Sequence, residues 1–159
     1  MKQSIASLVK HLEAWTRAEI VGQQKLADCL MKQMEAVAEQ APADVVAATR
    51  SLDRELGTVA KRLALKQRIL AGFEEHWGVP ASTMSLVSIA ERVGAEGAPL
   101  LELRKELRDA SATVVGLNRK ASALLALHRG LYREIIETLL ADEHGNPLEQ
   151  AGSLVDASV

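Results

Sequence analysis

The chain has 159 residues, with 19 Lys and Arg against 21 Asp and Glu and a formal net charge of -2. This length is typical of one domain with a sizeable core, and the balanced charge argues against a nucleic-acid-binding protein. A single cysteine excludes an internal disulfide, and aromatic residues at 3% argue against a sheet protein. Charged residues interrupt every apolar run, so we expect neither a signal peptide nor a membrane span, and the expected location is cytoplasmic.

A long helix is expected first, over about residues 4–40. Its apolar residues recur every three or four positions, which is the helical period. The phase slips between Glu19 and Gly22, and such a stutter locally unwinds a coiled coil. The pattern then resumes with Leu26, Leu30, Met34 and Val37 on the buried side, and Gln33 is the alternative to Met34.

A second long helix is expected over 43–77, followed by a short one over 84–93. Pro42 suits the first helical position, and the short connection before it predicts an antiparallel hairpin with the first helix. Gly78 suits the left-handed position that ends the second helix. The short helix is apolar on a wide face and ends at Gly94, so we expect it to pack against one end of the bundle.

The longest periodic stretch predicts a third long helix over 99–141, of roughly 40 residues and about 60 Å. A helix with one apolar seam is not stable alone in water and needs partner helices. The seam positions are Leu100, Leu103, Leu107, Ala110, Val114, Leu117, Ala121, Leu124, His128, Leu131 and Ile135.

Beyond Ala121, the apolar surface of this helix becomes wider than a seam. The additional apolar residues are Leu125, Leu127, Tyr132, Ile136, Leu139 and Leu140. Two interpretations stay open: the short helix and the hairpin cover this surface, or an amphipathic helix of a partner binds it. Residues 142–159 lose the period, carry four acids and no Lys or Arg, and predict a flexible tail.

Together these elements predict an all-α fold with three long helices in an antiparallel, coiled-coil-like bundle, one short helix and a disordered C-terminal tail. The expected domains are a helical bundle over 1–141 and a flexible tail over 142–159. Helical glycines such as Gly116 and Gly130 are explained either by exposed, neutral positions or by local softness that lets a helix receive a partner.

No motif in the sequence predicts catalysis, a cofactor or a metal site. The chain lacks His-Glu-x-x-His, Glu-x-x-His, a glycine-rich phosphate loop and Gly-x-Ser-x-Gly. His128 lies on the seam, where a packed residue bonded to a neighbour is favoured over a ligand or a pH switch. Cys29 lies near the seam of the first helix and is interpreted as a buried thiol. We therefore do not expect an enzyme.

Three segments resemble the FlgN-type flagellar export chaperones. The segment 63–77, LALKQRILAGFEEHW, is similar to the leucine-rich second helix of that family. The segment 84–140 resembles its short apolar helix and its Leu-Asn pair, here Leu117-Asn118, before a leucine-rich helix end. The glycine-containing end of the chain resembles the C-terminal extension of the family. Ala121 departs from the family, which often has a second Asn there.

The resemblance implies a cytosolic, non-catalytic chaperone of bacterial flagellum assembly and type III protein export. It would bind the C-terminal helical regions of hook-associated proteins, prevent their premature assembly at the hook–filament junction and deliver them to the cytoplasmic domain of the export gate. Client binding in the family belongs to the C-terminal part. Here that part contains Leu124, Leu127, Leu131, Ile135, Ile136, Leu139, Leu140, Leu148, Leu154 and Val155.

Tyr132, the only tyrosine, is the candidate for docking to the export gate, although a packed ring is the simpler interpretation. A different class of function also fits the helices. The chain would then be a structural coiled-coil adaptor or a homodimeric scaffold with no export role, in which the same apolar face pairs with another copy.

Overall fold

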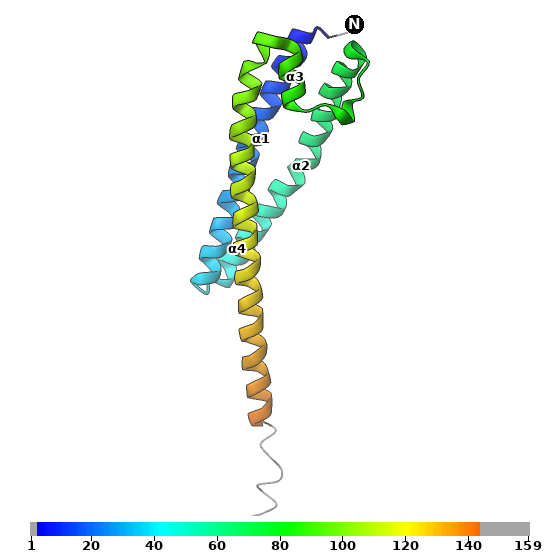
Figure 1. Cartoon of the computed structure of the whole chain (residues 1–159). Coiled ribbons are helices and arrows are strands. Elements are labelled where there is room, and N and C mark those ends of the chain that lie inside the picture. Colours follow the sequence, from blue (N-terminus) through cyan, green and yellow to red (C-terminus); the bar gives the residue numbers. More distant parts are fainter. Residues whose placement is uncertain (1–2, 144–159) are drawn as a thin grey trace, which may run out of the picture. The chain divides into compact units, whose positions relative to one another are not determined.

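The computed structural model describes residues 3–143 of the chain, and the side chains of residues 3–140. This part of the chain is all-α, and it contains the three long helices and the short helix that the sequence predicts (Figure 1). None of its helices is long and apolar enough to span a membrane. The helices are α1 (Ile5–Ala38), α2 (Pro42–Trp77), α3 (Leu86–Val93) and α4 (Ala98–Glu143), and the 3-10 turns are η1 (Ala81–Thr83) and η2 (Gly94–Gly97).

The chain divides into two compact units, residues 1–121 and residues 122–159, so that the second unit begins within α4. We expected a bundle domain over 1–141 and a tail over 142–159, and the division therefore lies earlier than the predicted boundary. Residues 142 and 143 belong to α4 rather than to a tail. The rest of the predicted tail, residues 144–159, lies outside the described residues.

The α1–α2 hairpin is defined by its ends. The Ser4 hydroxyl accepts a hydrogen bond from the Ser7 N–H at 3.2 Å and caps α1. Pro42 is the first residue of α2, as predicted. Gly78 has φ +64 and ends α2 in the left-handed conformation, which glycine adopts without steric cost. These signals place the two helices side by side in opposite directions (Figure 1).

One hydrophobic core joins all four helices at one end of the first unit. The short helix α3 contributes Ile89 and Ala90 to it, so its predicted packing against the bundle is confirmed. A capping box between Ser85 and Ser88 begins α3. The core residues are Leu8, Val9, Leu12 and Trp15 of α1, Ile69, Leu70 and Phe73 of α2, Ile89 and Ala90 of α3, and Leu100 of α4.

Within the first unit, the predicted seam of α4 is buried or half-buried. Leu100, Leu103 and Ala121 are buried, and the seam positions between Leu107 and Leu117 are half-buried. Leu107 lines a hollow together with Trp15 of α1 and Leu63 of α2, and Ala110 lines another with Ile20 of α1, so this part of α4 packs as part of the bundle.

Candidate functional site

The second half of α4 carries a continuous apolar surface, which we call the α4 face: the apolar side chains from Leu124 to Leu140. Their spacing of three and four residues places them along one side of the helix, and the intervening positions widen that side. Leu124 is half-buried. The exposed members are Leu125 37%, Leu127 60%, Leu131 48%, Tyr132 59%, Ile135 54%, Ile136 55%, Leu139 59% and Leu140 50%.

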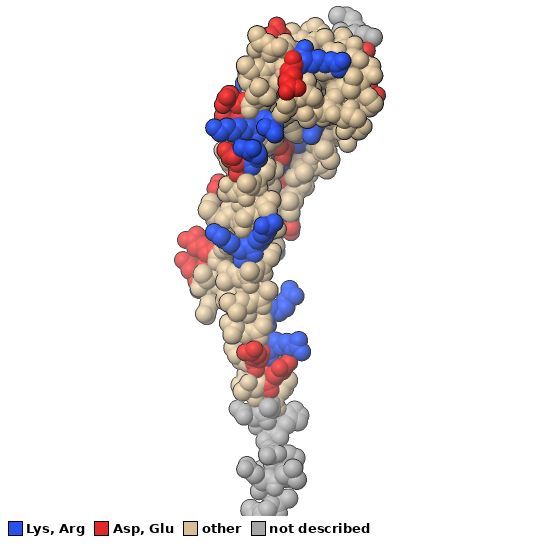
Figure 2. All heavy atoms as spheres, viewed as in Figure 1, with Lys and Arg blue, Asp and Glu red and all other residues tan. Residues whose placement is uncertain are grey.

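This surface is unusual because large apolar residues on a folded chain normally occur singly in water. In Figure 2 the stretch directly before the grey residues shows both basic and acidic side chains next to other residues, so charged groups border the apolar side chains there. The short helix places Ile89 in the core with Leu100, at the beginning of α4.

Six of the predicted client-binding residues are exposed on the α4 face, and Leu124 is half-buried. The other three, Leu148, Leu154 and Val155, lie outside the described residues. The structure therefore describes the predicted client-binding residues of the α4 face and not those beyond residue 143.

Two rings lie next to one another on the α4 face. The centroids of His128 and Tyr132 are 6.5 Å apart, with the ring planes tilted by 42°. His128 is half-buried, as its seam position predicts. Tyr132 is exposed. An exposed tyrosine offers both an apolar ring and a hydroxyl to a partner.

A polar cluster lies inside the α1–α2 hairpin, away from the α4 face in the sequence. Arg62 Nε donates to Glu19 Oε2 at 2.6 Å, and its Nη1 donates to Thr58 Oγ1 at 2.5 Å. The Gln23 amide donates a hydrogen bond of 2.9 Å to the other carboxylate oxygen of Glu19. The Trp15 indole donates to the backbone oxygen of Arg62 at 2.7 Å.

The sequence did not reveal this cluster, although the phase slip between Glu19 and Gly22 marks its position. The side chains of Arg62 and Glu19 are only 16% and 13% exposed. Gly22 makes room for the guanidinium, because a Cβ at that position would lie 2.6 Å from Arg62 Cζ. At the phase slip an ion pair between Glu19 of α1 and Arg62 of α2, which we call the polar crossing, replaces an apolar seam contact. This pairing fixes the register of α1 and α2.

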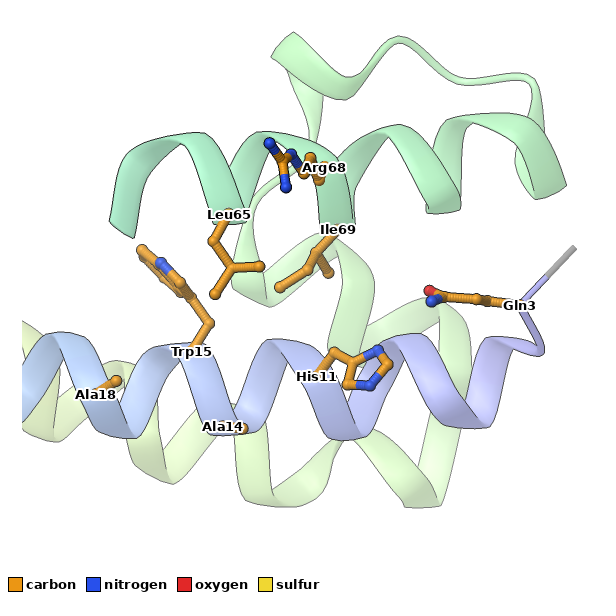
Figure 3. A pocket seen from close by; sticks show the side chains of 8 residues that line it. All are labelled: Gln3, His11, Ala14, Trp15, Ala18, Leu65, Arg68 and Ile69. Atoms are coloured by element: carbon orange, nitrogen blue, oxygen red, sulfur yellow. The ribbon is translucent and has the colours of Figure 1, made fainter. Parts of the chain in front are cut away.

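A groove of about 450 Å³ runs between α1 and α2 beside this cluster. Trp15, Leu65 and Ile69 give it an apolar wall, and Gln3, His11 and Arg68 supply its polar groups (Figure 3). Figure 3 shows Trp15 and Leu65 at one end and Gln3 at the other. His11 and Arg68 are the titratable residues among those that line it.

Metal and thiol chemistry receive no support from the described side chains. No group of three or more His, Cys, Asp or Glu among them is arranged to hold a metal ion. Cys29 is half-buried rather than fully buried. The exposed apolar side chains of the α4 face make it the strongest candidate for a working surface.

Comparisons with protein-family models, with curated proteins and with solved structures give no match to this chain.

Proposed function

We propose that this chain is a non-catalytic, cytoplasmic chaperone of the FlgN type. In this proposal it binds the C-terminal helical regions of hook-associated proteins, prevents their premature assembly and delivers them to the flagellar export gate. The exposure of the α4 face is the observation that supports the proposal most strongly. The resemblance of segments 63–77 and 84–140 to that family supplies the identity of the client.

The α4 face suits an amphipathic helix as its ligand. A helix in a complex of this kind inserts side chains spaced by three, four and seven residues, and Leu124, Leu131 and Ile135 present the same spacing. Burial of such side chains contributes about 1.5–3 kcal/mol each. Because an unassembled client helix exposes its own apolar side, covering it would prevent premature association with other clients.

The test is the affinity of the full chain for the C-terminal helical region of a hook-associated protein from the same genome, measured by calorimetry. Changing Leu131→Asp together with Ile135→Asp should weaken binding by more than about 100-fold, since an uncompensated buried charge costs about 3–5 kcal/mol. Ala126→Asp is the matched control, because Ala126 is exposed on the opposite side of the helix.

Removal of residues 142–159 tests the contribution of Leu148, Leu154 and Val155, and it should also weaken client binding. Full retention of affinity by both the double variant and the truncated chain contradicts the proposal. Tyr132→Ala should leave client binding largely intact and weaken binding to the cytoplasmic domain of the export gate, if that ring is the docking contact.

A further inference from the structure

Two hollows between α1 and α2 lie along the same side of the hairpin. The groove beside Trp15 is lined by Ala18 of α1 and Leu65 of α2, and a second hollow of about 360 Å³ is lined by Ala36 of α1 and Ala47 of α2. On each helix the two residues are 18 positions apart, which is about five turns and about 27 Å. Because complete turns return to the same side of a helix, both hollows border one side of α1 and α2, which we call the hairpin side.

Exposed cations border the hairpin side around the first hollow. Arg68 lines the groove itself, and Lys61 precedes it on α2 by one heptad, so both lie on the same side of that helix. Lys25 follows Ala18 on α1 by one heptad in the same way. All three cationic side chains are exposed, and none forms an ion pair with another residue in the part of the chain that the structure describes.

The acids in this stretch do not neutralise these cations. From residue 56 to residue 73, no charged residue of α2 is acidic. From residue 14 to residue 27, the one acid of α1 is Glu19, which pairs with Arg62 at 2.6 Å. The hairpin side therefore presents uncompensated positive charge beside the apolar wall of Trp15, Leu65 and Ile69.

The sign of the charge reverses at the second hollow. Glu35, Glu39 and Asp44 line it, and Lys32 is the one cation among its lining residues. A polyanion, such as a nucleic acid or the surface of an anionic membrane, would be attracted to the first hollow and repelled by the second. A protein helix can carry carboxylates along most of its length and a cation near one end, so it can match both hollows.

We propose that the hairpin side binds an amphipathic helix of another protein. Apolar side chains of that helix, about five turns apart, enter the two hollows. Its carboxylates lie beside Lys25, Lys61 and Arg68, and a Lys or Arg near one of its ends lies beside Glu35 and Asp44. The site lies within the first unit and does not depend on the function proposed for the α4 face.

The test uses two synthetic helical peptides of about 22 residues, long enough to reach both hollows. Both carry Leu at spacings of three and four. One has Glu beside the Leu positions and Lys at one end, and the other has every charge reversed. Fluorescence anisotropy measures their binding to the full chain carrying Leu131→Asp and Ile135→Asp, so that the α4 face does not contribute. The first peptide should bind at least about tenfold more tightly than the reversed one.

Lys61→Glu with Arg68→Glu should weaken binding of the first peptide by at least about tenfold. The same variant should bind the reversed peptide more tightly than the natural residues do, and this gain also shows that the variant folds. Arg104→Glu with Lys105→Glu is the matched control, because it makes the same change of charge at exposed residues of α4 that line neither hollow. The control should leave both affinities within about twofold.

Equal affinity for the two peptides, no loss in the Lys61→Glu, Arg68→Glu variant, or an equal loss in the control variant would each overturn the proposal. A dimer of the natural chain that dissociates in the Lys61→Glu, Arg68→Glu variant during sedimentation would assign the hairpin side to a second copy instead. Binding to phosphatidylglycerol vesicles that this variant abolishes, with no binding of either peptide, would assign it to a membrane.

Discussion

The ion pair between Glu19 and Arg62 gives the sharpest stability prediction, because both side chains are more than four-fifths buried. Replacing Glu19→Leu keeps the volume and removes the carboxylate, so that the guanidinium remains buried without its charge partner. Arg62 Nη2 already has no hydrogen-bond partner, and the variant adds an unpaired charge to that deficit. We expect a loss of about 3–5 kcal/mol in the free energy of unfolding.

Replacing both residues, Glu19→Leu with Arg62→Met, removes the buried charge together with its partner. This double variant should be close to the natural chain or more stable by about 1–4 kcal/mol, because desolvation of the pair is no longer needed. Urea unfolding followed by circular dichroism measures both variants. A single variant that loses less than about 1 kcal/mol, or a double variant that loses as much as the single one, would refute this account of the cluster.

Three glycines within helices give further predictions: Gly22 in α1, Gly57 in α2 and Gly130 in α4. Gly22→Ala should lower the free energy of unfolding by about 1–3 kcal/mol, because the added Cβ displaces the guanidinium of Arg62. Gly57 has no atom within 4 Å of the position that a Cβ would take, so Gly57→Ala should raise the free energy of unfolding by about 1 kcal/mol in the same urea assay. A Cβ at Gly130 also meets open space. Gly130→Ala should therefore stabilise the helical conformation of α4 by about 1 kcal/mol and leave client affinity within about twofold in calorimetry. A marked loss of affinity in the Gly130 variant would instead support softness of the helix as a functional property.

Helix type and extent could be predicted from the sequence because the period of apolar residues is strong and the ends carry local signals. Pro42 and Gly78 bound α2 through backbone preferences that do not depend on the rest of the fold. The apolar pattern placed Met34 before Gln33 as the buried residue, and this preference was wrong because Gln33 is buried and Met34 is half-buried. The structure buries Gln33, because its amide donates to Thr49 on α2 at 2.9 Å.

The polar crossing could not be predicted, because it depends on which residues meet between helices. Glu19 and Arg62 are 43 positions apart, and each alone resembles an ordinary charged residue on a helix surface. Sequence periodicity fixes which side of a helix is apolar, but the pairing of residues across a hairpin follows from its register. The phase slip at Glu19–Gly22 was the only trace of the crossing in the sequence.

The α4 face could be located from the sequence, since an apolar arc wider than one seam is visible in the order of residues. Its exposure could not, because exposure depends on what packs against it. Tyr132 illustrates this, because its position adjoins the seam and yet 59% of its surface is exposed.

Site-specific photocrosslinking tests the central claim, that the α4 face binds the client, most directly. A benzophenone amino acid is placed at Leu131 on the face or at Ala126 on the opposite side of the same helix, in cells that produce the hook-associated proteins. The account predicts client adducts from position 131 and few or none from position 126. Client adducts of equal yield at both positions, or none at position 131, would contradict it.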